Sequence, residues 1–421
     1  MCGNCDADGY DSPVSERIAM WTSRRLTVWG TGLLLVSWFI YAHTMMVPGY
    51  IDRAGRFKGT DYIYFYVMGS LMLDGRADAL YDADAHLAEG RRRIDPGLAL
   101  YAPYSNYGPQ VAAAFAPLAR LRFGTSLALF LVLSALSYAA SVWIVWRQCP
   151  ALWPYPGVTA ILAAASPAFF SMIRYAQLSA FTLLLLSAAL AALRHNRRFL
   201  AGVVIGTTVF KPQMGLVIGV AMLVAGEWRV VGGAIAAAAA QLVLAWAISG
   251  SDVMTEYLGV LWTLARNPAL VQIYPTEVHS LRGFFQLLLP SSVALPAITL
   301  TALVAVLVIA VKTWQRGGTV AVKWGQLVIL SILASPHLLT YDLVLLTIPL
   351  IAFAGWAVTH RGHPLQPWVG RLLLLLYLAP FSSNLVRIVP IQLSVVVMGL
   401  LVWTMYAASR EKSARTVLIQ D

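Results

Sequence analysis

The sequence predicts an all-α polytopic membrane protein, and three observations support this. Hydrophobic residues make up 59% of the 421 residues, charged residues make up only 12%, and the mean hydropathy is +0.70. A soluble protein of this size carries about twice that share of charged residues. Several apolar runs are also long enough to cross a bilayer as helices. This composition excludes an intrinsically disordered chain, a collagen-like chain and a disulfide scaffold.

The apolar segments predict about twelve helical segments. Two of them are composite, because a proline interrupts the helical hydrogen-bond pattern: 199–226 should break at Lys211-Pro212, and 324–358 at Ser335-Pro336. The segments are 26–47, 123–146, 155–173, 178–193, 199–226, 230–249, 291–311, 324–358, 372–389 and 391–408.

The basic residues predict the orientation of these helices. Lys and Arg outnumber Asp and Glu by 30 to 19, which in a soluble protein would suggest a nucleic-acid partner. With the N-terminus inside, sixteen of the 30 lie in cytoplasmic segments, nine lie in the loop 48–122 and five lie elsewhere outside. Long loops translocate largely regardless of charge, so the informative comparison is sixteen against five. We therefore expect both termini in the cytoplasm, and no nucleic-acid partner.

The expected organisation is a membrane domain between two short tails. Residues 1–25 form a disordered cytoplasmic tail without a signal-peptide pattern, residues 26–408 the membrane domain, and residues 409–421 a second cytoplasmic tail. The outer loops are 48–122 and 250–290. The apolar stretch 107–118 (YGPQVAAAFAPL) is too short to span, and we interpret it as re-entrant or interfacial.

With this topology, the polar residues that interrupt apolar runs all fall at the outer ends of helices. They are Gln177, Lys211, His337, Tyr341, Asp342 and Asn384. Asp61 lies just after the first span and precedes an aromatic run, Tyr62 to Leu73, expected to be a helix along the outer interface. Asp61 is either a catalytic carboxylate or simply an N-cap of that helix.

Each other polar residue also has two possible interpretations. Lys211 could bind a phosphate or extend to the interface. Asp342 could contact a substrate or be the counter-ion of Lys211 or Arg174. His337 and the group His279, Ser280 and Arg282 could meet an anion or be ordinary loop residues.

Common catalytic and metal-binding patterns are missing. The chain has no GxxxxGK[ST], GxGxxG, HExxH or GxSxG motif. Cys2 and Cys5 form a lone CxxC, and the acidic residues of the first loop lack diagnostic ligand spacing. We assign no metal or other cofactor, and metal dependence and oligomeric state stay open.

In their order and spacing, several motifs resemble glycosyltransferase family 87 over roughly residues 26–360. They are GTDYIYFY, LMLDGRADALYD, YGPQVAAAFAPLARL, YAQLS, FKPQ, HSLRG and SPHLLTYD. The chain departs from the family pattern at Ala176 to Ser179 and at Val278 to Leu281, so acceptor contacts transfer least well.

The resemblance implies a GT-C-like fold and a hexosyltransferase that uses a polyprenyl-phosphate sugar, with mannose as the first candidate. The acceptor would be a lipid or glycan hydroxyl on the extracytoplasmic face of the plasma (inner) membrane. Asp61 is matched to the general base, and Lys211, His337 and Arg282 to the donor phosphate. The expected substrate-binding residues are Tyr62, Tyr64, Tyr107, Gln177, His279, Tyr341 and Asp342.

Two other functions remain open. Intramembrane ionisable residues and broken helices also mark the substrate pathways of secondary transporters and lipid flippases. A non-catalytic membrane assembly subunit would leave Asp61 as a cap and Lys211 as an interfacial residue.

Overall fold

The computed structural model describes residues 22–99, 106–267, 274–290 and 293–417. Within these ranges the elements are helices, with two isolated β-bridges and no strand, so the all-α prediction is confirmed. Residues 1–21 and 418–421, which include Cys2, Cys5 and most of the predicted first tail, lie outside the described residues.

The α-helices are α2 (Ser23–Met45), α3 (Tyr62–Leu73), α4 (Ala83–Arg93), α5 (Pro109–Phe115), α6 (Phe123–Arg147), α7 (Pro156–Ala164), α8 (Pro167–Tyr175), α9 (Ser179–Arg194), α10 (Arg198–Gly206), α11 (Pro212–Val224), α12 (Trp228–Arg266), α13 (Leu281–Leu288), α14 (Leu295–Gln315), α15 (Val320–Ala334), α16 (Thr347–Thr359), α17 (Gln366–Tyr377), α18 (Ser382–Val386) and α19 (Leu393–Val417). The 3₁₀ helices that matter below are η2 (Ala77–Ala79), η3 (Leu118–Arg120), η5 (Thr207–Phe210), η7 (Pro275–Glu277), η8 (Thr340–Leu346) and η9 (Ala379–Phe381).

Several helices meet the length and hydropathy of a membrane span, which confirms the prediction of a polytopic membrane protein. Among the described residues, five helical stretches qualify: α2, α6, α12, α14 and the stretch Thr340–Thr359, which joins η8 to α16. The pair α7 and α8 qualifies as a sixth if its 43° bend is counted within one span. The remaining apolar helical stretches are 10–17 residues long.

Both predicted proline breaks are present. The α10–η5 stretch ends at Phe210 and α11 begins with Pro212 at its first position, where the missing N–H costs nothing. Helix α15 ends at Ala334, directly before Ser335-Pro336. The segment 155–173, predicted as continuous, is likewise divided at Ser166-Pro167.

Helix α12 has a break at the predicted end of segment 230–249, and a second helical stretch then runs on to Arg266. Gly250, with φ 83° and ψ 172°, interrupts the helical geometry in the middle of α12. Residues 251–266 are thus helical, although the second outer loop was expected to begin at residue 250. They pack on α5 and η2, and Tyr257 stacks on Tyr81 with ring centroids 5.8 Å apart.

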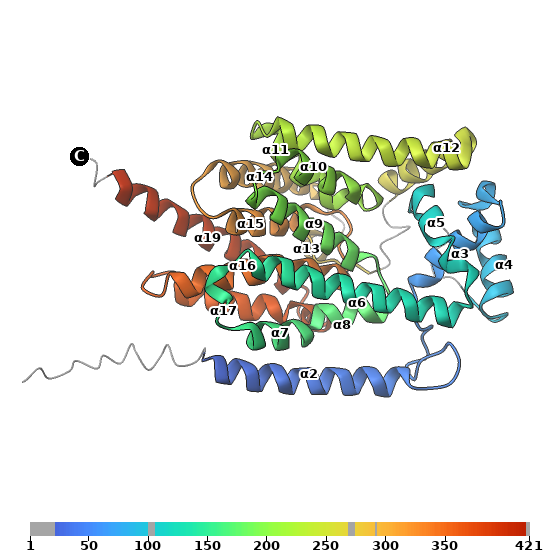
Figure 1. The fold of residues 1–421 in the computed structure, drawn as a ribbon, viewed down its shortest axis with the longest axis horizontal. Helices are drawn as coiled ribbons and strands as arrows, with labels where there is room; N and C mark the ends of the chain where they lie inside the picture. The colour runs from blue at the N-terminus through green and yellow to red at the C-terminus, as the bar shows by residue number, and fades with distance from the viewer. Residues whose placement is uncertain (1–21, 100–105, 268–273, 291–292, 418–421) are drawn as a thin grey trace, which may run out of the picture.

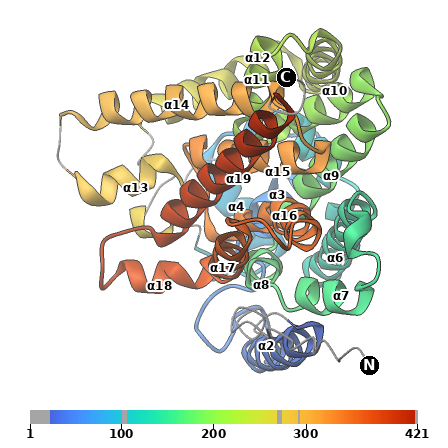
Figure 2. The same cartoon turned by 90° about the vertical axis from the view of Figure 1, so that its left-hand side faces the viewer.

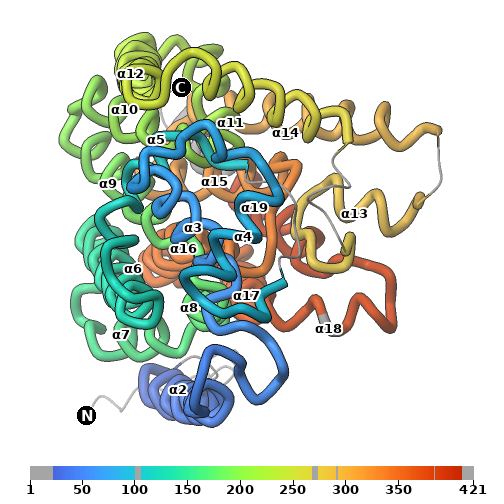
Figure 3. The backbone as a smooth tube through the Cα atoms, turned by 90° about the vertical axis from the view of Figure 1, so that its right-hand side faces the viewer, coloured from blue at the N-terminus to red at the C-terminus, as the bar shows by residue number. Residues whose placement is uncertain are grey.

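The bundle has two distinct ends (Figure 1). Helices α3, α4 and α5 gather at one end, called here the long-loop end, while the start of α2 and the end of α19 lie at the other (Figures 1 and 2). This agrees with both termini being on one side. Figure 3 views the long-loop end, with α2 at one edge of the bundle and α12 at the opposite edge. The main packing partners of α2 are α7 and α8.

Helix α3 is a core helix and not the interfacial helix that the aromatic run predicted. Nine of its twelve residues are buried, and Tyr62, Phe65 and Tyr66 pack with Phe115, Phe123 and Phe130 in a separate hydrophobic cluster. A helix that is apolar on all sides is stable only when surrounded. The cluster supports residue 61, which immediately precedes α3.

Small residues allow α10 and α12 to pack closely. A Cβ atom added at Gly202 would lie 1.9 Å from the carbonyl oxygen of Val230, and one at Gly233 would lie 2.1 Å from that of Phe199. Membrane helices commonly approach one another through such residues. This contact holds α10 in place, and with it the break at Lys211.

Two adjacent glycines of α12 should therefore respond oppositely to alanine. Gly233→Ala should lower the free energy of unfolding by about 1–3 kcal/mol through overpacking. Gly232→Ala, where a Cβ atom meets nothing within 4 Å, should raise it by up to about 1 kcal/mol through helix propensity. Thermal unfolding in detergent measures both, and equal effects of the two substitutions would contradict the packing described.

Candidate active site

Asp61 lies at the junction between the first loop and α3. Its backbone N–H donates to the Tyr175 carbonyl at 3.1 Å, which fastens the junction to the end of α8. Its side chain makes no capping hydrogen bond to α3. The carboxylate Oδ2 instead accepts a hydrogen bond from Gln177 Nε2 at 2.6 Å. The interpretation of Asp61 as simply an N-cap is therefore wrong.

Gln177 connects Asp61 to two tyrosines. Ala176 adopts a left-handed conformation (φ 53°) that ends α8, and the chain then reverses into α9, which turns Gln177 into the protein. The Gln177 amide donates to Tyr341 Oη and accepts from Tyr107 Oη, both at 3.3 Å. We call Asp61, Gln177, Tyr107 and Tyr341 the Asp61 network. It joins residues of four separate chain segments.

Lys211 is buried beside this network, at the predicted proline break. Its Nζ donates to Asp342 Oδ1 at 2.5 Å and to Ser179 Oγ at 3.2 Å, and Ser179 Oγ also donates to Asp342 Oδ1 at 2.5 Å. We call these three residues the Lys211 cluster. Because Lys211 is only 5% exposed, it does not extend to the interface. Asp342 is its counter-ion, one of the two alternatives for that residue.

Tyr341 links the network to the cluster. Its hydroxyl accepts from Gln177, and its ring centroid lies 5.4 Å from Lys211 Nζ, in cation–π geometry. Two carboxylates, Asp61 and Asp342, therefore share one ammonium, which leaves an excess of negative charge. A phosphate at this point needs cations other than Lys211.

Burial makes Asp61 a stronger base than an ordinary carboxylate. Desolvation raises the pKa of Asp61 to about 6, against the Gln177 hydrogen bond and the Lys211 charge, which lower it. The group is thus ionised at neutral pH and still accepts a proton readily.

The other two residues predicted to bind the donor phosphate form a separate group. Arg282, on α13, and His337, in the break between α15 and η8, are both half-buried, and the Arg282 charge acts on the His337 ring. Neither side chain shares a hydrogen bond with the Asp61 network among the described residues. The structure thus places the predicted phosphate ligands at two locations, Lys211 at one and the pair Arg282 and His337 at the other.

His279 does not reach the Asp61 network, contrary to its predicted contact with substrate. The side chain is fully buried, and burial lowers the pKa of His279 to about 3, so the ring is neutral. Its Nδ1 pairs with Ser394 Oγ at 2.7 Å, and its Nε2 with Thr340 Oγ1 at 3.1 Å and Ser383 Oγ at 3.0 Å. Through Thr340 it positions the neighbouring Tyr341.

The tyrosines that follow Asp61 also differ from expectation. Tyr62 has no exposed surface, and its hydroxyl hydrogen bonds to Ser126 at 2.5 Å, so its predicted contact with substrate is wrong for this conformation. Tyr64 is half-buried. The reason is the helical period, which turns successive residues of α3 in different directions.

Sequence reasoning missed Tyr175 and Ser179 as parts of the site. Both flank Gln177 in the stretch YAQLS, so a closer reading of that helix junction could have found them.

Among the described residues, no three His, Cys, Asp or Glu side chains are grouped closely enough to hold a metal ion. Cys149 is a buried free thiol.

The buried pair of Lys211 and Asp342 should dominate the stability of the site. Asp342→Asn leaves Lys211 without its counter-ion and should cost about 3–5 kcal/mol of unfolding free energy. The double variant Lys211→Met, Asp342→Leu should recover most of that loss, because no buried charge remains. Thermal unfolding in detergent, with Ser179→Ala as a milder control, measures this. Wild-type stability of Asp342→Asn would contradict the pairing.

Comparison with known proteins identifies the family. Residues 105–336, more than half of the chain, match glycosyltransferase family 87. The matched stretch contains Gln177, Lys211, His279 and Arg282, whereas Asp61 and Asp342 lie outside it. No curated protein and no solved structure matches the chain. The chain belongs to glycosyltransferase family 87 and is a membrane glycosyltransferase.

Proposed function

We propose that this glycosyltransferase moves a hexose, with mannose as the first candidate, from a polyprenyl-phosphate donor to a hydroxyl of a lipid or glycan acceptor. Asp61 is the general base. The observation that carries the proposal is the half-buried Asp61 carboxylate, held by Gln177 and with its pKa raised to about 6. A base of this strength is suited to removing a hydroxyl proton near neutral pH.

The reaction is a single displacement. The acceptor oxygen attacks the anomeric carbon, the bond from that carbon to the phosphate oxygen breaks, and the hydroxyl proton passes to Asp61. The polyprenyl phosphate leaves with the bonding electrons. Because attack and departure occur on opposite faces of the sugar, the anomeric configuration inverts.

The leaving phosphate needs cations that are not already neutralised. Arg282 offers a planar group of donors that matches phosphate oxygens, and His337 lies within its electrostatic reach. Lys211 is paired with Asp342. Burial and the Arg282 charge lower the pKa of His337 to about 4, so its ring is neutral. We therefore assign the charged phosphate contact to Arg282, with His337 as a neutral hydrogen-bond donor beside it. The Lys211 charge has a supporting role, since it holds Asp342 and the Tyr341 ring in place.

The arrangement in the membrane follows from the same assignments. The long-loop end faces the extracytoplasmic side of the plasma membrane, and both termini face the cytoplasm. The donor's polyprenyl chain remains in the hydrocarbon while its sugar reaches the Asp61 network. Family membership favours transfer over transport or a purely structural role.

The first test is removal of the base. Asp61→Asn keeps the size of the side chain but cannot accept the proton, and it should lower kcat by about 10²–10⁴-fold. The assay supplies membranes with labelled polyprenyl-phosphate mannose and candidate acceptors. Asp84→Asn, an exposed carboxylate of α4, is the matched control and should retain native activity. Native transfer by a folded Asp61→Asn protein would refute the role of Asp61.

The second test is the pH dependence. The base works only when deprotonated, so kcat/KM should fall about tenfold per pH unit below pH 6. The Gln177 hydrogen bond lowers the pKa of Asp61. Gln177→Ala should therefore move this limb of the profile to higher pH. If this limb stays at the same pH or moves to lower pH, it does not report the ionisation of Asp61.

A further inference from the structure

The motif LMLDGRADALYD, residues 71–82, has no part in the proposed reaction, yet it contacts the Asp61 network. Its tyrosine, Tyr81, is only 5% exposed, and the Tyr81 hydroxyl donates to the backbone carbonyl of Tyr107 at 3.1 Å. The Tyr107 hydroxyl donates to Gln177 Oε1, and Gln177 Nε2 donates to Asp61 Oδ2. Consecutive hydrogen bonds therefore connect Tyr81 to the proposed base through Tyr107 and Gln177.

The chain on both sides of Tyr81 is fixed. His86 Nε2 donates to the Leu80 carbonyl at 2.8 Å. Asp82 Oδ1 accepts from two backbone N–H groups at 2.8 and 3.2 Å, and so caps the start of α4. The backbone of Tyr81 lies between these two contacts, which hold it in place.

The ring of Tyr81 is held by α12. It stacks on the Tyr257 ring, with centroids 5.8 Å apart and an interplanar angle of 23°. Tyr257 is also 5% exposed and belongs to the stretch of α12 after Gly250, which lies beside α5 at the long-loop end (Figure 1). The stack keeps the Tyr81 ring, and with it the hydroxyl, against Tyr107.

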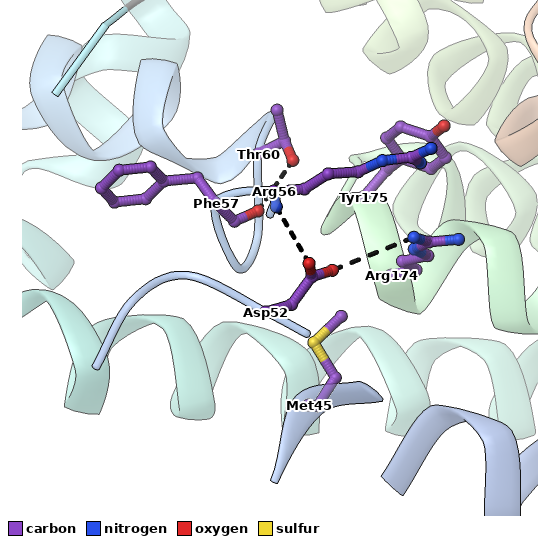
Figure 4. Close-up of a pocket in the computed structure, with 7 residues that line it drawn as sticks. All are labelled: Met45, Asp52, Arg56, Phe57, Thr60, Arg174 and Tyr175. Atoms are coloured by element: carbon purple, nitrogen blue, oxygen red, sulfur yellow. Dashed lines mark hydrogen bonds and ion pairs between the residues drawn. The ribbon is translucent and has the colours of Figure 1, made fainter. Parts of the chain in front are cut away.

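The backbone of Asp61 is held by other contacts. Figure 4 shows the turn before it, where Thr60 Oγ1 donates to the Phe57 carbonyl at 2.9 Å. The Asp61 backbone N–H donates to the Tyr175 carbonyl at 3.1 Å. A change in the motif should therefore affect the hydrogen bonding of the carboxylate and leave the backbone of the base in place.

The hydrogen bond from Tyr107 helps to set which way the Gln177 amide faces. An amide offers donors on its nitrogen and an acceptor on its oxygen, so a donor at Oε1 favours the orientation in which Nε2 faces Asp61. Gln177 Oε1 accepts from the Tyr107 hydroxyl at 3.3 Å and from the Leu178 backbone N–H at 3.1 Å. The reversed amide would place one acceptor against another at the carboxylate.

We propose that Tyr81 is a positioning residue for the transfer reaction: it holds Tyr107 where the Tyr107 hydroxyl keeps the Gln177 amide turned toward Asp61. This rests on the proposed function, because it assigns Tyr81 an effect on the same base. It also gives the motif LMLDGRADALYD a role in the reaction that is exerted through Tyr107 and not through contact with substrate.

The titratable groups around Asp61 are held by contacts outside the motif. They are Lys211, Asp342, Tyr341, Tyr107 and Tyr175. The Lys211 cluster is joined by its own hydrogen bonds. Removing the Tyr81 hydroxyl leaves every one of these groups in the protein, so a change in the ionisation of Asp61 would report the Gln177 hydrogen bond.

The test is Tyr81→Phe, which keeps the ring and its stack on Tyr257 and removes only the hydroxyl. It should lower kcat about tenfold through misplacement of the base, and change KM less than about twofold. Because the Gln177 hydrogen bond lowers the pKa of Asp61, its weakening should move the acidic limb of kcat/KM to higher pH, by up to about one pH unit. The assay uses the full-length protein in membranes with labelled polyprenyl-phosphate mannose.

Two further variants separate positioning from general loosening. Tyr66→Phe removes a hydroxyl that donates to the Leu121 carbonyl at 2.8 Å in the same hydrophobic cluster. It should lower the thermal midpoint about as much as Tyr81→Phe and leave the acidic limb unchanged. Tyr107→Phe should move the limb in the same direction as Tyr81→Phe. The double variant should have the kcat of Tyr107→Phe alone, since both changes act on one series of contacts.

Three outcomes would overturn the inference. They are an unchanged limb in Tyr81→Phe, an equal movement of the limb in Tyr66→Phe, and kcat losses that multiply when Tyr81→Phe is combined with Tyr107→Phe. If Asp61→Asn abolishes transfer while one of these outcomes occurs, the inference fails and the proposed function stands. Native transfer by Asp61→Asn would overturn the proposed function, and the inference with it.

Discussion

The hydrogen bond between Gln177 and Asp61 is the contact on which the rest of the site depends. It joins the long loop to the membrane bundle and gives the carboxylate a fixed position at 2.6 Å from the amide. Through the other atoms of the same amide, Tyr107 and Tyr341 are placed as well. A single side chain at the reversal between α8 and α9 thereby organises four segments.

The buried ion pair of Lys211 and Asp342 also stabilises this arrangement. Lys211 is tolerable inside an apolar bundle only because Asp342 neutralises it. The pair fixes η8, which carries Tyr341, and His279 fixes the same segment through Thr340. Packing of α10 against α12 through glycines holds the break at Lys211 in place. The geometry of the Asp61 network therefore depends on contacts within the bundle.

Much of the fold could be predicted from sequence, because hydropathy and proline act locally. The apolar runs predicted the helical membrane protein, and Pro212 and Pro336 marked two breaks correctly. The burial of α3 and the second helical stretch of α12, after the break at Gly250, could not be predicted, since both depend on tertiary neighbours. Within the site, Asp61, Gln177 and Tyr341 stood out as polar residues in apolar surroundings. The direction of each side chain could not be predicted from the sequence, so Tyr62 and His279 were wrongly expected to contact the substrate.

The most direct measurement is a structure of the protein with a non-transferable polyprenyl-phosphonate sugar. The account predicts that the phosphonate contacts Arg282 and His337 and that the anomeric carbon faces Asp61, with room for one hydroxyl between them. Reacting atoms in such a complex approach to about 3–3.5 Å. A sugar bound away from Asp61, with that carboxylate still engaged by Gln177, would contradict the account.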